Sequence, residues 1–306
     1  MKFVFLALLV VLGLAASIAL VRSKKELTRH KKESAFMRFE ARDFPEHGVS
    51  LIVPSNPSFG HLLTKLESTS IQDPYSVLLK NTGTRAVVGY SLKWQCFDDR
   101  GETSGRNLSN DRNLNNCITW VFLHGEESDR KEAVKSSEDV IKPHSIWLIN
   151  SDGAARSIGG TGSGDAVAFS TTQLESSEVK TIPGCVSIRV TVDGIFFDDG
   201  TFIGPDTNGL FHRVKSEMDA RHELLQGIHN NLKSGKKADE IFKELEKIRD
   251  GEAIRLGALP TADQRAFFRN LFAKDVLGRK ELFGVDKAIE DIQLQLSKPW
   301  VTPRKL

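Results

Sequence analysis

Apolar and polar residues alternate along residues 86–98, and this is the clearest such pattern in the chain. The apolar positions of this segment are Val88, Tyr90, Leu92, Trp94 and Cys96. Successive side chains of a strand point to opposite faces, so the alternation predicts a strand with one buried and one solvated face. The pattern also places Trp94 and Cys96 in the core.

The same period recurs along residues 185–197, where the apolar set is Val186, Ile188, Val190 and Val192. Further short strand-like runs occupy residues 75–81, 117–125 and 144–150. No helical segment separates these runs, which argues against a parallel α/β sheet, and strands with one wet face are typical of antiparallel sheets. We therefore expect residues 37–205 to form an antiparallel β-sandwich.

From residue 206 onward the apolar residues change to helical spacing. The stripes are Phe211, Val214, Met218, Leu225, Ile228 and Leu232; then Ala238, Ile241, Leu245 and Ile248; then residues 261–278; and last Val285, Ile289, Ile292 and Leu296. Such stripes indicate amphipathic helices that bury one face. We expect residues 206–306 to form a helical domain of about four α-helices, which makes the fold class α+β.

The chain opens with an apolar run. Residues 3–21 carry no charge and would form a helix about 28 Å long, close to the thickness of a bilayer core. The run also contains small-x-small sequences typical of signal-peptide cleavage sites, so residues 1–21 predict an apolar helix that is either a signal peptide or a membrane anchor. We expect export to the cell envelope, periplasmic or membrane-anchored, with the membrane as a partner through this helix. The basic linker at residues 22–36 is contrary evidence, because positive charge favours the cytoplasmic side.

Two stretches resemble a known group of proteins. "LLKNTGTRAVVGYSLKWQCFDDRGE" and "VIKPHSIWLINSDG" resemble the Ig-like sandwich of uncharacterised exported bacterial proteins, in which an Asn-Thr turn leads to a long strand with a Trp. "VTVDGIFFDDGTFIGPD", which leads into a helix, resembles members of the same group. The resemblance implies an Ig-like β-sandwich with a helical C-terminal region, and it implies no activity.

Composition and cysteines narrow the function classes. The 306 residues are 40% hydrophobic and 27% charged with a net charge of +2, which does not indicate a nucleic-acid partner. The three cysteines, Cys96, Cys117 and Cys185, lack the Cys-x-x-Cys spacing of a zinc ribbon or a thioredoxin-like site. A Cys96–Cys117 bridge and buried free thiols are the two alternatives.

The segment from Val190 to Gly209 gathers four aspartates. Asp199-Gly200 between β-forming residues predicts a two-residue hairpin turn of type I′, which requires positive φ at both residues. One residue of the set Asp206, Thr207 and Asn208 then suits the N-cap of the following helix. Turn and cap explain most of this segment.

The remaining aspartates offer a candidate cation site. Asp193, Asp198 and Asp206 are the candidate metal ligands, although the alternating ligands and distal Glu of a calcium loop are missing. We expect no cofactor and assign no catalytic residue.

Two other motifs carry little chemistry. His222-Glu223 begins like a zinc-protease helix, but residue 226 is Gln where the second His should stand, and His229 lies two turns on. The glycine-rich residues 157–166 lack the Lys-Ser/Thr of a P-loop and predict a surface loop.

These features favour a non-enzymatic cell-envelope protein that serves as an interaction or structural module for an unidentified protein partner. The alternative is a metal-dependent hydrolase with a site between Asp193 and Asp206, because fold alone does not decide function.

Overall fold

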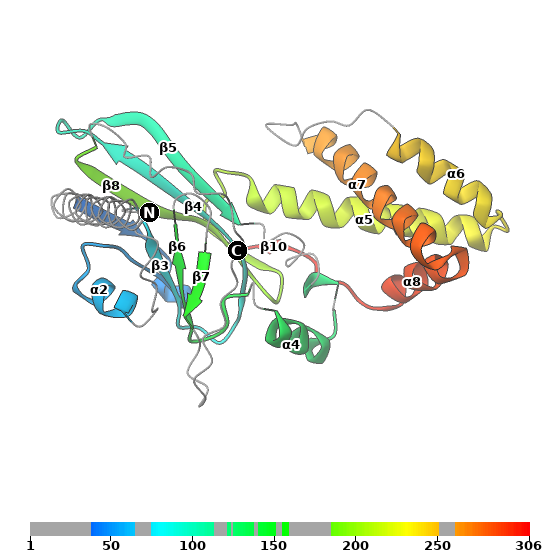
Figure 1. Cartoon of the computed structure of the whole chain (residues 1–306), viewed down its shortest axis with the longest axis horizontal. Helices are drawn as coiled ribbons and strands as arrows, with labels where there is room; N and C mark the ends of the chain where they lie inside the picture. Colours follow the sequence, from blue (N-terminus) through cyan, green and yellow to red (C-terminus); the bar gives the residue numbers. More distant parts are fainter. Residues whose placement is uncertain are drawn as a thin grey trace, which may run out of the picture.

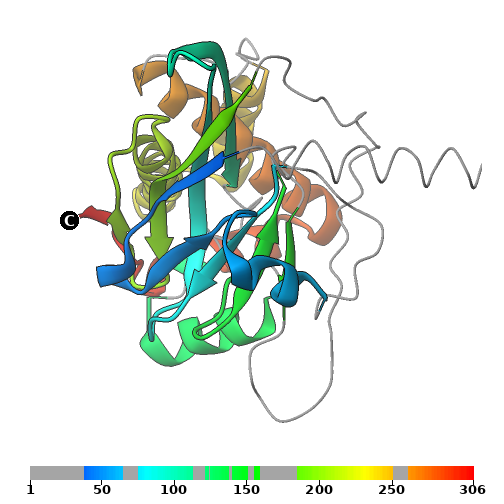
Figure 2. The same cartoon turned by 90° about the vertical axis from the view of Figure 1, so that its left-hand side faces the viewer.

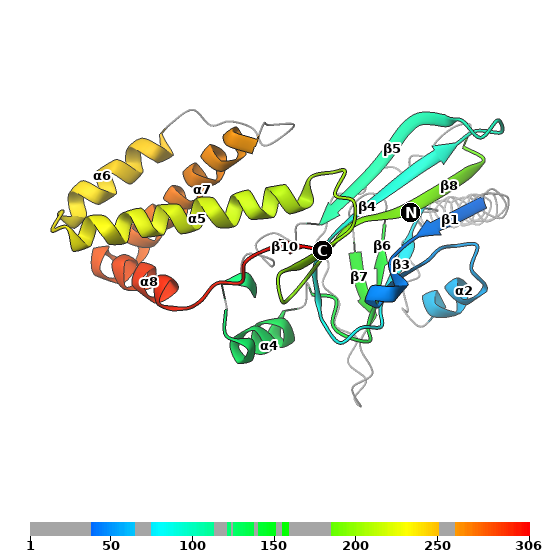
Figure 3. The ribbon, with the colours of Figure 1, turned by 180° about the vertical axis from the view of Figure 1, so that it is seen from behind.

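Two β-sheets and a group of helices make up the computed structural model, which describes residues 38–64, 75–112, 121–123, 125–137, 140–150, 155–158, 185–250 and 261–306. The two sheets pack face to face. Helix α2 covers the outer face of one sheet, while α5 to α8 extend away from the other (Figure 1). Seen from behind, the same arrangement places β1 and α2 far from these four helices (Figure 3).

Sheet A follows the order β10-β9-β8-β4-β5, with β1 paired to β8 beside this path. Its strands are β1 (Arg38–Arg42), β4 (Val87–Phe97), β5 (Thr103–Arg112), β8 (Ser187–Phe197), β9 (Thr201–Ile203) and β10 (Arg304–Lys305). Strands β5, β4, β8 and β9 pair antiparallel, whereas β1 runs parallel to β8 and β10 runs parallel to β9. Sheet A is therefore mixed.

Sheet B is antiparallel throughout, in the order β2-β3-β6-β7. Its strands are β2 (Val49–Ile52), β3 (Val77–Asn81), β6 (Ile146–Ile149) and β7 (Ala155–Ile158), and the short 3-10 helix η1 (Pro45–His47) precedes β2. Figure 2 shows the strands of both sheets with α2 in front of them.

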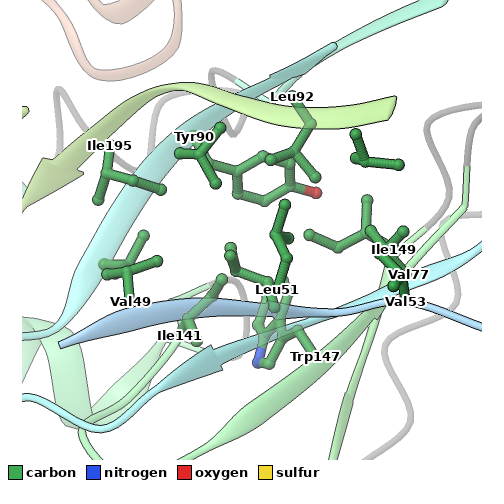
Figure 4. Close-up of a cluster of buried hydrophobic side chains, with 14 of the residues drawn as sticks. Val49, Leu51, Val53, Val77, Tyr90, Leu92, Ile141, Trp147, Ile149 and Ile195 are labelled. Atoms are coloured by element: carbon green, nitrogen blue, oxygen red, sulfur yellow. The ribbon is translucent and has the colours of Figure 1, made fainter. Parts of the chain in front are cut away.

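The main core lies between the two sheets (Figure 4). Tyr90, Leu92 and Trp94 of β4 meet side chains of sheet B such as Leu51 and Trp147. Trp94 is 1% exposed, and its indole Nε1–H donates a hydrogen bond to the carbonyl of Tyr75 at 2.9 Å, so its polar atom is satisfied inside the core. The predicted burial of Trp94 and of Cys96 is confirmed.

The outer faces of the two sheets are covered differently. Helix α2 (Pro57–Thr64) covers sheet B through Phe59, which packs on Leu78 and Leu148. Sheet A is covered by α4 (Glu127–Ser136), the first turns of α5 and the end of the chain, and these contribute Val134, Leu210, Val214, Met218 and Val301. Sheet A is thus buried on both faces along part of its length.

The helices after sheet A form a second core. They are α5 (Leu210–Lys233), α6 (Ala238–Arg249), α7 (Thr261–Phe283) and α8 (Val285–Ser297), and the four predicted apolar stripes lie one in each. Trp300, just beyond α8, is partly buried against both this core and the outer face of sheet A. Its indole Nε1–H donates to the carbonyl of Gln295 at 2.8 Å, so the end of α8 is tied to the segment that returns to the sheet.

The predicted Ig-like antiparallel β-sandwich is wrong, although two sheets do enclose a core. The parallel pairs β1–β8 and β10–β9 make sheet A mixed, which also overturns the resemblance to Ig-like exported proteins. Alternation reports which face of a strand is buried, and it carries no information on which distant strand lies alongside or in which direction. The apolar helix predicted for residues 1–21 and the basic linker at 22–36 lie outside the described residues.

The predicted Cys96–Cys117 bridge is wrong, and neither Cys96 nor Cys185 is a free thiol. Cys96, near the end of β4, forms a disulfide with Cys185, two residues before β8, with a Cα–Cα distance of 5.6 Å. The two strands are neighbours, and the register pairs Cys96 with Ile188, so the bridge joins adjacent strand ends. Cys117 lies outside the described residues.

The helices that the structure describes include none that is both long and apolar enough to cross a membrane.

Gly194 of β8 provides a test of the packing in sheet A. A Cβ at this position would collide with the ring of Phe202, which is fully buried and lies against Phe196 at a centroid distance of 4.8 Å. We expect Gly194→Ala to lower the free energy of unfolding by about 1–3 kcal/mol, the usual cost of overpacking, as measured by urea denaturation.

The matched control is Gly227→Ala in α5, where a Cβ would meet open space. A helical alanine should leave the stability equal or raise it by up to about 1 kcal/mol. Equal effects of the two substitutions would show that the contact with Phe202 is not tight.

Candidate functional site

The segment from Val190 to Gly209 lies where sheet A gives way to α5. The β8–β9 hairpin is closed by the N–H of Gly200, which donates to the carbonyl of Phe197 at 3.0 Å, and Gly200 has a φ of 83°. Asp199 has no positive φ, since His144 and Asp206 are the only non-glycine residues with positive φ in the described part of the chain. The predicted type I′ turn is therefore wrong, and a three-residue loop with a left-handed glycine takes its place.

Asp193 organises the connection that follows this hairpin. Its side chain is buried, and Oδ1 accepts hydrogen bonds from Thr207, from the backbone N–H at 3.0 Å and from the hydroxyl at 2.6 Å. Oδ2 accepts the N–H of Asn208 at 2.8 Å and lies 3.5 Å from the hydroxyl of Ser91. The carboxylate therefore holds the connection against the outer face of β8, and these bonds supply what a buried charge requires.

Asp206 acts on the start of α5 from outside the N-cap position. Its φ is 63°, and its Oδ1 accepts the N–H of Phe211, the second residue of the helix, at 2.9 Å. The N-cap position itself is Gly209, so the prediction of Asp206, Thr207 or Asn208 at this position is wrong. Asp193 binds the N–H groups of Thr207 and Asn208, and the chain makes one more turn before the helix begins.

Asp199 sits in a cluster of charges at the hairpin. Its Oδ1 accepts the N–H of Thr201 at 2.9 Å, and its Oδ2 lies 3.3 Å from Arg85 and 3.5 Å from Arg304. Partial burial opposes ionisation, but the hydrogen bonds from Thr201 and the Arg85 cation outweigh it, so the pKa of Asp199 is below its ordinary value. Arg85 also stacks on the ring of Phe197, 3.9 Å from its centroid.

Asp198 has the opposite electrostatic character. Burial raises the pKa of its carboxyl, and the adjacent negative charge of Asp199 adds to this effect. One carboxyl oxygen of Asp198 is buried without a hydrogen-bond partner among the described residues. Two neighbouring aspartates of one turn thus have pKa values displaced in opposite directions.

Only two of the three candidate metal ligands lie next to each other. Asp193 and Asp206 are adjacent, because the N–H of Asp206 donates to the carbonyl of Asp193 at 2.9 Å, while Asp198 belongs to the hairpin loop. In the part of the chain that the structure describes, no group of three His, Cys, Asp or Glu could hold a metal ion.

Both residues of the zinc-protease-like motif, His222 and Glu223, lie in α5 and contact neighbouring side chains. The ring of His222 packs edge-on against Trp300 with a centroid distance of 5.0 Å, and Glu223 lies 3.2 Å from Arg265. His229 is partly buried further along α5. Of residues 157–166, the first two belong to β7 and the rest lie outside the described residues.

A cleft beside the hairpin escaped the sequence analysis. It has a volume of about 510 Å³ and is lined by Gly125, Arg130, Asp199, Val301, Thr302 and Arg304. These residues come from the loop before α4, from α4 itself, from the hairpin and from the end of the chain. No local sequence motif connects segments so far apart, and Asp199 is the one lining residue that belongs to a motif of the sequence.

Comparison with known proteins finds no matching protein-family model, no matching curated protein and no matching solved structure.

The carboxylate of Asp193 should be essential to the join between β8 and α5. In Asp193→Asn, one carboxylate oxygen becomes an NH₂ group, which cannot accept the hydrogen bonds that Thr207 or Asn208 donates there. We therefore expect the free energy of unfolding to fall by about 1–3 kcal/mol. Asp219→Asn is the control, because that carboxylate forms surface ion pairs with Lys215 and Arg265 and should cost less than about 1 kcal/mol. A smaller loss in Asp193→Asn than in the control would contradict the role given to Asp193.

The pKa displacements of Asp198 and Asp199 predict pH effects of opposite sign. An acid with a raised pKa in the folded state destabilises that state once the pH exceeds its unfolded pKa, near 4. Asp198→Asn should therefore raise the stability at pH 7, and the gain should vanish as the pH falls below about 4.

Asp199→Asn is the mirror control. Its lowered pKa contributes stability above the unfolded pKa, so the substitution should reduce the stability at pH 7 and have less effect in acid. Urea denaturation across this pH range measures both, and a common sign would refute the assignment.

Proposed function

We propose that this protein is an exported, non-enzymatic component of the cell envelope that binds another protein. The N-terminal apolar run would direct export, either as a cleaved signal or as an anchor in the membrane. Three observations support this proposal.

The disulfide supports export. Cys96 and Cys185 are bridged, and Cys96 is buried in sheet A. Disulfides persist in oxidising compartments such as the periplasm and are rare in the cytosol.

The use of the aspartates supports a non-enzymatic role. The oxygens of Asp193 accept hydrogen bonds from Thr207 and Asn208, and Asp206 and Asp199 each accept a backbone N–H. These carboxylates serve the hairpin and the start of α5.

The observation that carries the binding proposal is a pair of exposed apolar side chains at the end of α7. Leu282 is 77% exposed and Phe283 is 64% exposed. The junction of α7 and α8 lies at the end of the helical group that points away from the sheets (Figures 1 and 3). Two adjacent large apolar residues at an accessible end are suited to insertion into a pocket of a partner, since burying each would contribute about 1.5–3 kcal/mol.

A reporter fused at Leu306 tests the location. Alkaline phosphatase activity of the fusion is expected, and N-terminal sequencing then distinguishes cleavage, with a start at Ala16 or Leu20, from an anchor that begins at Met1. A reporter active only in the cytoplasm would refute export.

Recovery of a partner from membranes, identified by mass spectrometry, tests the binding surface. Leu282→Asp with Phe283→Asp should abolish recovery of a protein that the wild type retains. Val186→Asp is the matched control, because Val186 is also an exposed apolar residue, at 46%, but lies beside β8. Equal recovery by all three proteins would contradict the assignment to the end of α7.

A further inference from the structure

The cleft beside the β8–β9 hairpin has walls fixed by close backbone contacts. The N–H of Val301 donates to the carbonyl of Phe122 at 2.9 Å, and the N–H of Arg304 donates to the carbonyl of Gly200 at 3.0 Å. Glycines allow this approach, because a Cβ on Gly125 would collide with the carbonyl of Pro299 and one on Gly200 would lie 2.8 Å from that of Thr302. In Figure 1 the returning segment before β10 passes above α4. The cleft is therefore formed before any ligand arrives.

Positive charge dominates among its lining residues. Arg130 and Arg304 line the cleft, and Asp199 is the one carboxylate among the lining residues that the structure describes. Arg85 lies 3.3 Å from Asp199 and already compensates its charge. The side chain of Arg304 is 66% exposed. Its Nη2 lies 3.5 Å from Asp199 and its Nε donates to the hydroxyl of Thr201 at 3.3 Å, so its other N–H groups can donate to a further acceptor.

Arg130 is the second cation available in the cleft. Its Nη1 donates to the carbonyl of Gly125, which is a neutral acceptor. No carboxylate of the described residues forms an ion pair with it. The nearby Asp198 acts on it only at longer range, and burial raises the pKa of that carboxyl.

The acidic residues at the start of α4 do not cancel these charges. Asp129 pairs with Lys298 at 3.0 Å, and Glu127 pairs with Lys131 at 2.6 Å. Each of these carboxylates has its own cation, although Glu127 also acts on Arg130 at longer range. Among the lining residues, the two arginines exceed the single carboxylate of Asp199 by one positive charge.

We propose that this cleft binds an oxyanion, either a carboxylate or a phosphate group, between Arg130 and Arg304. A guanidinium presents paired N–H donors in a plane that matches both groups, and charge-assisted bonds of this kind are among the stronger ones in proteins. The site is separate from the exposed end of α7 and does not depend on the function proposed for it.

Titration of the full chain by NMR tests the proposal, with inorganic phosphate and acetate as separate probes and chloride as a control for ionic strength. Saturable shifts are expected at the amides of Gly125, Gly200 and Thr302 with at least one probe and not with chloride. The stronger probe identifies the source of the oxyanion.

Variants then assign the binding to the two arginines. Arg130→Gln and Arg304→Gln should each weaken binding about tenfold, the effect of losing one charge-assisted hydrogen bond. Arg265→Gln, which alters an arginine of α7 outside the cleft, should leave the affinity unchanged. Absence of saturable shifts, shifts elsewhere in the molecule, or equal affinity in all variants would overturn the site. If a cleft variant fails to fold, the map of shifts on the wild type decides alone.

Discussion

The second half of β8 must be buried on both faces, and the arrangement of the other elements follows from this constraint. The first half of the strand alternates between partly exposed and buried residues, whereas every residue from Val192 to Phe197 is buried. Sheet B covers one face, and α4, α5 and the chain end cover the other. Gly194 then leaves room for the ring of Phe202, and Asp193 brings the N–H groups of the next connection onto the same face. A charged residue in a doubly buried strand is tolerated because hydrogen bonds satisfy its oxygens, and the same bonds position the connection that leads into α5.

The sequence predicts strand faces well where the strand is regular and poorly where it is not. Tyr90, Leu92 and Trp94 share the inner face as expected, but Val88 packs on the opposite side of the sheet. The register shift between Val87 and Gly89 explains this, because Val88 is the extra residue of a β-bulge and a bulge exchanges the faces of the residues beyond it. Ser91 lies on the outer face, as the alternation predicts, but it is buried because the connection before α5 covers this face, and Asn208 donates to its hydroxyl at 3.0 Å.

The helices and the candidate site differ in what local sequence can reveal. The apolar stripes at helical spacing correctly predict the helices, because each stripe is a property of a single segment. The disulfide, the parallel pairs and the arginine cleft each join segments far apart in the sequence, as with Cys96 and Cys185 at a separation of 89. The aspartates from Asp193 to Asp206 stand out in the sequence because they are close together, yet the role of each depends on the N–H group or arginine that it contacts. Local patterns carry no information on such meetings.

The parallel pairing of β10 with β9 has a consequence for the order of folding. Arg304 and Thr201 are 103 positions apart, and α5 to α8 lie between them in the chain. Helices rich in local contacts form quickly, while pairings between distant residues wait for the closure of long loops. We expect the packed helices to hold the two ends of that long loop near each other and so to remove much of the entropy of closure before β10 docks. The four packed helices thus act as a folded spacer between β9 and β10. We expect β10 to pair with β9 late in folding, and only when these helices are correctly packed.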